Sequence, residues 1–252
     1  MYNIYEICEK TNKYIQKHCF DEKCKLIQDA IMETREGEYI YSFAKYVKGA
    51  NIKKLEDAVI ETREGEYIYS FAECVRGANI RRLEDAIIKT RDAKNIFYFA
   101  RDVKGANIKK LEDAIIKIRD GEYIYSFAEY IKCANIRKLE DGIIKTRNGK
   151  YIYLFAEYIR GANIKKLEEA IIETRDGENI YKFARDIKGV NIKNLEDAII
   201  ETGDVNFIYY FAIDIKGANI IKLNNARKQI LERQETKKKP EEIDKLVDQL
   251  IQ

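Results

Sequence analysis

The sequence predicts an all-α fold, an α-solenoid of about seven 28-residue two-helix repeats, because two patterns recur at one fixed spacing. The first pattern is the pair Phe-Ala, which begins at Phe43, Phe71, Phe99, Phe127, Phe155, Phe183 and Phe211. The second pattern is a leucine, found at Leu55, Leu83, Leu111, Leu139, Leu167, Leu195 and Leu223. A constant period of this length indicates a supersecondary unit that buries its apolar face only by stacking on its neighbours.

The first helix of each repeat is predicted from an asparagine that precedes apolar residues at helical spacing. In residues 51–77, Asn51 precedes Ile52, Leu55 and Val59, which share one face of a helix. An asparagine side chain caps a helix by accepting a hydrogen bond from a backbone donor of the first turn. The equivalent asparagines are Asn79, Asn107, Asn135, Asn163, Asn191 and Asn219.

The second helix follows a break at residues 63–65. Ile68, Phe71 and Val75 then mark a second apolar face. We expect Gly77 to end this helix, because glycine readily adopts the left-handed conformation of a helix cap. Two helices of this length, each about 15 Å long, form a short hairpin that is marginal in water unless it is stacked.

The ends of the chain depart from the repeat. We expect residues 1–23 to form a degenerate N-terminal capping repeat and residues 24–233 to form the solenoid. Residues 234–240 resemble a basic linker, and residues 241–252 an amphipathic C-terminal helix that begins near a proline.

The C-terminal helix has two possible roles. Ile213 and Ile221 are apolar at positions where the other repeats carry charge in nearly every case, and could receive this helix. The helix would then cap the solenoid within the chain, or it would bind a second copy or another partner. The sequence is compatible with a monomer or with a dimer through the C-terminal helix.

Positions that stay constant between repeats are expected to serve stacking. An aromatic residue recurs on the flank of the second helix that meets the adjacent hairpin, at Tyr41, Tyr69, Phe97, Tyr125, Tyr153, Tyr181 and Tyr209. The first helices carry basic pairs followed by acidic pairs on opposite flanks. This arrangement predicts ion pairs between neighbouring repeats, such as Glu56 with Arg82.

Positions that vary between repeats are candidates for recognition. On the outer flank of the second helix, tyrosine alternates with Asn, Asp, Ser and Cys. Tyrosine is common in interface hot spots because it buries a large area at little rotamer cost. The predicted partner-binding residues are Tyr123, Tyr130, Tyr151, Leu154, Tyr158, Tyr39, Tyr46 and Tyr98. Packing of the same tyrosines against the neighbouring repeat is the competing explanation.

Basic rows suggest an alternative function, the binding of RNA or DNA phosphates. One row precedes the turn inside each hairpin, at Arg35, Arg63, Arg91, Arg119, Arg147 and Arg175. The other row follows the second helix, at Lys48, Arg76, Lys104, Lys132 and Arg160. Acidic residues interleave with both rows, and the net charge is only +3.

The sequence gives no sign of an enzyme, a cofactor or a membrane segment. Its single histidine, His18, lies near Cys8, Cys19 and Cys24, but their spacing lacks the paired short intervals of a zinc site. There is no Gly-rich phosphate loop and no long apolar run. Five cysteines at irregular spacing fit a reducing compartment, so we expect a cytoplasmic protein.

Ala-Asn-Ile at residues 106–108 and Ile-Tyr-x-Phe-Ala at residues 124–128 also carry a resemblance. Over residues 24–225 the repeat resembles a helical hairpin found in uncharacterised bacterial and phage proteins, which implies a HEAT-like α-solenoid and no shared activity. The function expected from the sequence is therefore non-enzymatic protein binding as a scaffold, adaptor or inhibitor. One specific version is a phage-type antagonist of a host defence complex.

Overall fold

The computed structural model describes the backbone of residues 3–251 and the side chains of residues 3–236, and it is all-helical over this range. The chain divides into two compact units between Asn135 and Ile136. The helices of the first unit are α1 (Ile4–His18), α2 (Glu22–Glu33), α3 (Gly37–Tyr46), α4 (Ile52–Thr62), α5 (Gly65–Cys74), α6 (Ile80–Thr90), α7 (Ala93–Asp102), α8 (Ile108–Ile118) and α9 (Gly121–Tyr130). The helices of the second unit are α10 (Ile136–Thr146), α11 (Gly149–Tyr158), α12 (Ile164–Thr174), α13 (Gly177–Asp186), α14 (Ile192–Thr202), α15 (Val205–Asp214) and α16 (Ile220–Ile251).

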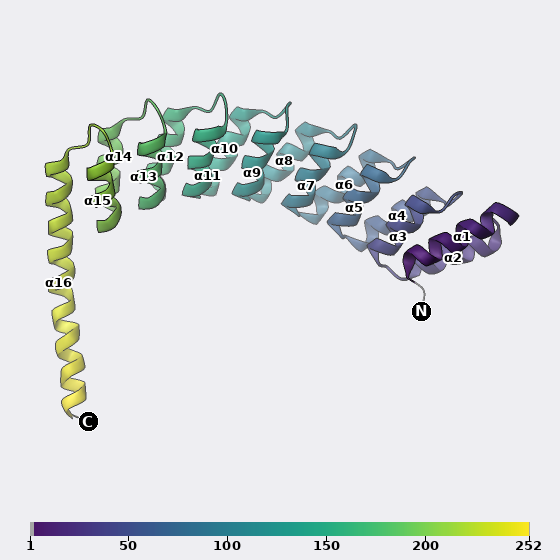
Figure 1. The fold of residues 1–252 in the computed structure, drawn as a ribbon, viewed down its shortest axis with the longest axis horizontal. Helices are drawn as coiled ribbons and strands as arrows, with labels where there is room; N and C mark the ends of the chain where they lie inside the picture. The colour runs from purple at the N-terminus through teal and green to yellow at the C-terminus, as the bar shows by residue number, and fades with distance from the viewer. Residues whose placement is uncertain (1–2, 252) are drawn as a thin grey trace. The chain divides into compact units, whose positions relative to one another are not determined.

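The predicted all-α solenoid of hairpins is confirmed. From α2 onward, even-numbered helices are the first helices of hairpins and odd-numbered helices are the second, which gives seven hairpins in the described chain. Within each unit successive hairpins lie side by side, so first helices form one row and second helices another (Figure 1). The phenylalanines of the repeat and Leu55 with its equivalents are fully buried between the rows.

The asparagine caps form as predicted and Gly77 is left-handed as expected, but the left-handed helix cap lies elsewhere. The Asn51 side chain accepts a hydrogen bond from the Lys54 N–H at 3.2 Å. Helix α5 ends at Cys74, and Gly77, with a φ of 88°, lies in the following loop, so it does not cap the helix. The left-handed cap belongs instead to the first helix, where Arg63 has a φ of 59°.

A buried glutamate joins each first helix to the next hairpin. Glu56 is 2% exposed, and its Oε2 accepts a hydrogen bond from the backbone N–H of Asn79 at 2.6 Å. The same bond links Glu84 to Asn107 and Glu112 to Asn135 in the first unit, and Glu140 to Asn163, Glu168 to Asn191 and Glu196 to Asn219 in the second. Each asparagine that caps a helix therefore has its own N–H satisfied by the preceding repeat.

The predicted ion pairs between repeats are confirmed. Arg82 Nη1 lies 3.0 Å from Glu56 Oε1 and Arg82 Nη2 lies 2.5 Å from Asp57 Oδ1. Lys110, Lys166 and Lys222 make the equivalent pairs with the acidic residues of the hairpin before them. The buried glutamate thus combines a backbone hydrogen bond with a partner charge, which is the arrangement that a buried carboxylate requires.

Both ends of the chain differ from the prediction. Residues 4–18 form one helix, not a capping hairpin, and α1 packs against α3 in the row of second helices. The linker expected at residues 234–240 is wrong, because α16 runs unbroken through it. This segment is rich in Glu, Lys, Gln and Arg, which favour helix and outweigh the single Pro240.

The continuous α16 also contradicts an intramolecular cap made by residues 241–252. A helix that does not turn back cannot cover Ile221 in its own first turn, and Ile213 and Ile221 remain 58% and 75% exposed. The side chains of residues 241–252 lie outside the described residues, so dimerisation through that segment stays a prediction. Among the described residues, no helix combines the length and apolar content needed to cross a bilayer.

We predict that Glu84→Ala lowers the free energy of unfolding by about 2 kcal/mol, because it removes the buried carboxylate that accepts the N–H of Asn107. The control is the neighbouring Asp85→Ala, which removes an exposed ion pair with Lys110 and should cost about 0–1 kcal/mol. Urea denaturation followed by circular dichroism compares the two variants. Equal losses would show that the buried bond has no special role.

Candidate protein-binding surface

The predicted partner-binding residues divide into exposed and half-buried groups. Tyr46, Tyr130 and Tyr158 occupy the same register position, in the last turn of α3, α9 and α11, and are 43%, 58% and 58% exposed. The remaining predicted residues are half-buried: Tyr39, Tyr98, Tyr123, Tyr151 and Leu154. The exposed position is therefore the one most available to a partner.

Three of the constant tyrosines serve stacking, as predicted. Tyr69 Oη donates a hydrogen bond to Asp102 Oδ2 of the next hairpin at 2.9 Å. In the second unit Tyr153 donates to Asp186 at 2.9 Å and Tyr181 donates to Asp214 at 2.6 Å. Phe97 stands in this row but has no hydroxyl group to donate. The residue that faces it in the next hairpin, at the position of Asp102, is Tyr130.

Two of the variable positions of the second helix face the preceding hairpin. Asn95 is buried, and a Cβ on Gly65 of the preceding hairpin would lie 3.2 Å from the Asn95 Cβ. Asp102, seven residues later, accepts a hydrogen bond from the Tyr69 hydroxyl of that same hairpin. Both residues therefore serve the contact between hairpins.

The structure brings Tyr98, Tyr123 and Tyr130 together around Phe97. The ring centroid of Phe97 lies 5.4 Å from that of Tyr98 and 6.2 Å from those of Tyr123 and Tyr130. Arg101 Cζ lies 4.6 Å from the Tyr98 centroid and 5.4 Å from the Phe97 centroid. We call these five residues the Phe97 cluster; it combines tyrosine and arginine, the side chains enriched in hot spots.

Two members of the Phe97 cluster were not predicted from the sequence. Phe97 was assigned to stacking alone, and Arg101 was not singled out. The signal was present, since Phe97 is the one non-tyrosine in its row and Arg101 is one helical turn beyond it.

The other predicted residues lie outside this cluster. Tyr46 packs against Tyr5 of α1, with ring centroids 6.0 Å apart. Tyr151, Leu154 and Tyr158 lie on α11 in the second unit.

The second unit holds an aromatic cluster that the sequence analysis did not select. The Tyr181 ring centroid lies 6.1 Å from those of Phe207 and Tyr210, and Arg185 Cζ lies 5.2 Å from the Tyr181 centroid. Each unit therefore carries one cluster of aromatic rings with an arginine against it.

Charges beside both clusters are fixed by hydrogen bonds. Arg101 donates to both oxygens of Asp102 at 2.8 Å, and this bond, helped by the Tyr69 hydroxyl, lowers the pKa of Asp102. In the second unit Arg185 and Tyr153 lower the pKa of Asp186 in the same way. Burial and then the acceptor carboxylate raise the pKa of Tyr69, which keeps its hydroxyl protonated as the donor.

The six arginines of the first basic row share an unusual backbone conformation. All six have positive φ, between 55° and 64°. The last hairpin has Gly203 at the equivalent position. This conformation costs a residue with a side chain about 1 kcal/mol or more relative to glycine. All six side chains are exposed, and within the described residues none forms an ion pair.

The two basic rows do not form one stripe. The arginine row lies at the turn between the first and second helix, whereas Lys48 and its equivalents follow the other end of the second helix. A ten-residue helix of about 15 Å separates the two ends. A nucleic-acid strand that follows one row would therefore not contact the other along the same line.

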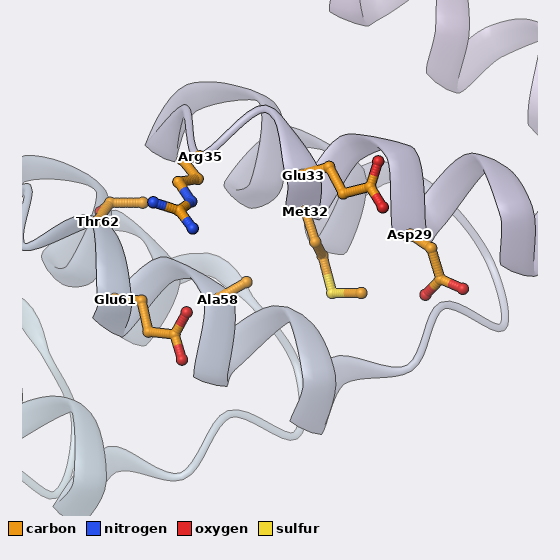
Figure 2. A pocket seen from close by; sticks show the side chains of 7 residues that line it. All are labelled: Asp29, Met32, Glu33, Arg35, Ala58, Glu61 and Thr62. Atoms are coloured by element: carbon orange, nitrogen blue, oxygen red, sulfur yellow. The ribbon is translucent and has the colours of Figure 1, made fainter.

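A surface groove of about 780 Å³ lies between α2 and α4. Figure 2 shows Met32 between the two helices, with Asp29 and Glu33 on α2 and Glu61 on α4. Because its charged lining is mainly acidic, the groove suits cationic groups better than anions. It contains neither histidine nor cysteine.

The region around His18 has the features of ordinary packing. The His18 ring lies 4.6 Å from the Tyr14 ring, and burial raises the pKa of the Cys8 thiol to about 11, which makes it a poor nucleophile. Within the part of the chain whose side chains are described, no group of three or more His, Cys, Asp or Glu residues could hold a metal ion.

Comparison with protein families, with curated proteins and with solved structures finds no match to this chain.

We predict that the double variant Asp102→Asn, Asp186→Asn is about 1–2 kcal/mol less stable than the wild type at pH 7, because asparagine lacks the charge that strengthens the hydrogen bonds from the neighbouring arginine and tyrosine at each site. Since both pKa values are lowered by folding, the wild-type advantage is complete above the ordinary value of 3.8 and fades as the pH falls through the lowered pKa values. Urea denaturation between pH 7 and pH 3 measures this convergence. Glu201→Gln, which alters an exposed carboxylate, is the control and should show no such trend.

Proposed function

We propose that the protein is a non-enzymatic binding module for another protein, acting as a scaffold, adaptor or inhibitor, with the Phe97 cluster as the central contact. The observation that carries this proposal is that Tyr130 is 58% exposed while its ring rests against Phe97. A tyrosine held in place before binding loses little entropy when a partner covers it.

The surroundings of Tyr130 support this assignment. Tyr98 is half-buried and Arg101 stacks on it, so the cluster offers aromatic faces and a guanidinium whose orientation is fixed by Asp102. Tyr158 occupies the equivalent exposed position in the second unit. An antagonist of a host defence complex is one form that such a module would take.

We predict that Tyr98→Ala with Tyr130→Ala weakens partner binding about thirtyfold or more, because truncation of a hot-spot tyrosine costs about 2 kcal/mol. The purified chain is used to capture proteins from a lysate, with and without nuclease, and the bound protein is then titrated against both forms. Tyr158→Ala tests the second unit separately.

Tyr210→Ala is the matched control, since Tyr210 is 45% exposed but lies in the second unit, outside the Phe97 cluster. The control should bind like the wild type, and all variants should keep the wild-type circular dichroism spectrum. A protein partner that binds the double variant and the wild type equally would place the interface elsewhere.

The arginine row supports a second candidate function, the binding of RNA or DNA. Six exposed arginines adopt a conformation that glycine would adopt at lower cost. An acidic or amide residue follows each of them, however, which reduces the attraction for phosphates. Protein binding therefore remains the first proposal.

The substitution Arg91→Gly with Arg119→Gly separates these functions. It should raise the free energy of unfolding by about 1 kcal/mol for each site, because glycine relieves the left-handed strain. If the row binds nucleic acid, the variant also loses affinity and shows a shallower salt dependence. Unchanged affinity for single-stranded and double-stranded probes would remove this row from the site.

A cytoplasmic location fits this proposal. The five cysteines are free, and two of them, Cys8 on α1 and Cys24 on α2, are buried. A reducing compartment keeps such thiols unpaired.

A further inference from the structure

Large aliphatic side chains are exposed in the hairpins at the two ends of the described chain. Among residues 3–236 the exposed leucine and isoleucine residues are Leu26 in α2, Ile213 in α15, and Ile220 and Ile221 in α16. Their exposed fractions range from 55% to 75%. Because end repeats of a solenoid normally present a polar outer face for solubility, these side chains need an explanation.

The C-terminal end has lost the charges that internal hairpins carry. Ile213 occupies the position of Lys45, Glu73, Arg101, Glu129, Glu157 and Arg185. Ile221 occupies the position of Lys53, Arg81, Lys109, Arg137, Lys165 and Lys193. Asn224 and Asn225 replace the acidic pair, Glu196 and Asp197 in the preceding hairpin, that binds the next repeat.

The same end has a first helix without a second. Asn219 donates its N–H to Glu196 at 2.6 Å and Leu223 is fully buried, so α16 begins as the first helix of an eighth hairpin. It then continues to Ile251, and within the described residues no second helix follows to cover the outer flank of α15. Tyr209 on that flank is 43% exposed, whereas its equivalent Tyr181, covered by α15, is 9% exposed.

The N-terminal end has a second helix without a first. Helix α1 packs on α3, where Asn12 Nδ2 donates to the carbonyl of Tyr46 at 2.6 Å. No helix precedes α2 in the row of first helices within the described chain. Leu26 stands at the position of Lys54, which points back to Asp29 of the preceding hairpin at 3.7 Å.

We propose that the C-terminal end of one copy of the chain binds the N-terminal end of a second copy, head to tail. Helix α16 of the first copy and α1 of the second then complete one hairpin. Within residues 3–251, the C-terminal end presents an unpaired first helix and the N-terminal end an unpaired second helix. The residues that would meet are also compatible in charge. Leu26 would lie against Asn225, and both are neutral, where hairpins inside the solenoid have a lysine–aspartate pair. Because the two surfaces differ, the contact is heterologous and can add further copies.

The test uses end variants that place an unpaired charge where the two copies would meet. Leu26→Glu blocks the N-terminal end, since its carboxylate would face neutral Asn225, and Asn225→Glu blocks the C-terminal end, since its carboxylate would face Leu26. Sedimentation velocity of the full chain is measured up to about 100 µM, with circular dichroism as the folding control. Both positions are exposed, so the variants should fold like the wild type.

We expect the wild type to gain mass with concentration and each end variant alone to stay monomeric, with its dissociation constant raised at least about tenfold. An equimolar mixture of the two end variants should form a dimer and stop there, because one intact end remains on each partner. A monomeric wild type would overturn the proposal. Continued assembly of either variant alone would also overturn it, since that result requires two identical ends to meet.

Discussion

The hydrogen bond from the asparagine N–H to the buried glutamate of the preceding hairpin is the interaction on which the solenoid depends. Short hairpins are not stable alone, so the chain must fix how each one seats on the last. A carboxylate taken out of water needs partners, and here it finds a backbone donor and a neighbouring Lys or Arg. Apolar packing supplies most of the burial, but this bond sets the register.

The sequence predicted the hairpins, their asparagine caps and the ion pairs, because each depends on local spacing. It did not predict the burial of Glu56, since an acidic residue in a charged run is normally solvated and only stacking places it under the next asparagine. Left-handed Arg63 was also missed, because glycine is the usual residue there. The linker at residues 234–240 failed because Pro240 was given more weight than the helix formers around it.

The candidate site was predictable in part. Comparison of the repeats located the variable tyrosines, yet it could not tell which rings face solvent and which face the preceding hairpin. Tyr123 and Tyr130 differ by two helical turns, and both contact Phe97, but only Tyr130 is largely exposed. The exposure of each ring depends on which residues of the adjacent hairpin lie against it. Tertiary packing determines those contacts, and the 28-residue period of the sequence does not reveal them.

The exchange of Tyr69 for Phe97 in one hairpin, and of Asp102 for Tyr130 in the next, has a consequence for how this gene can evolve. Tandem repeats gain and lose hairpins by unequal recombination, which places formerly distant hairpins next to each other. Deletion of the hairpin that carries Phe97 would place Tyr69 against Tyr130, so the Tyr69 hydroxyl would lose its carboxylate acceptor. A change in the order of the hairpins at this point would therefore cost the array one hydrogen bond between neighbours.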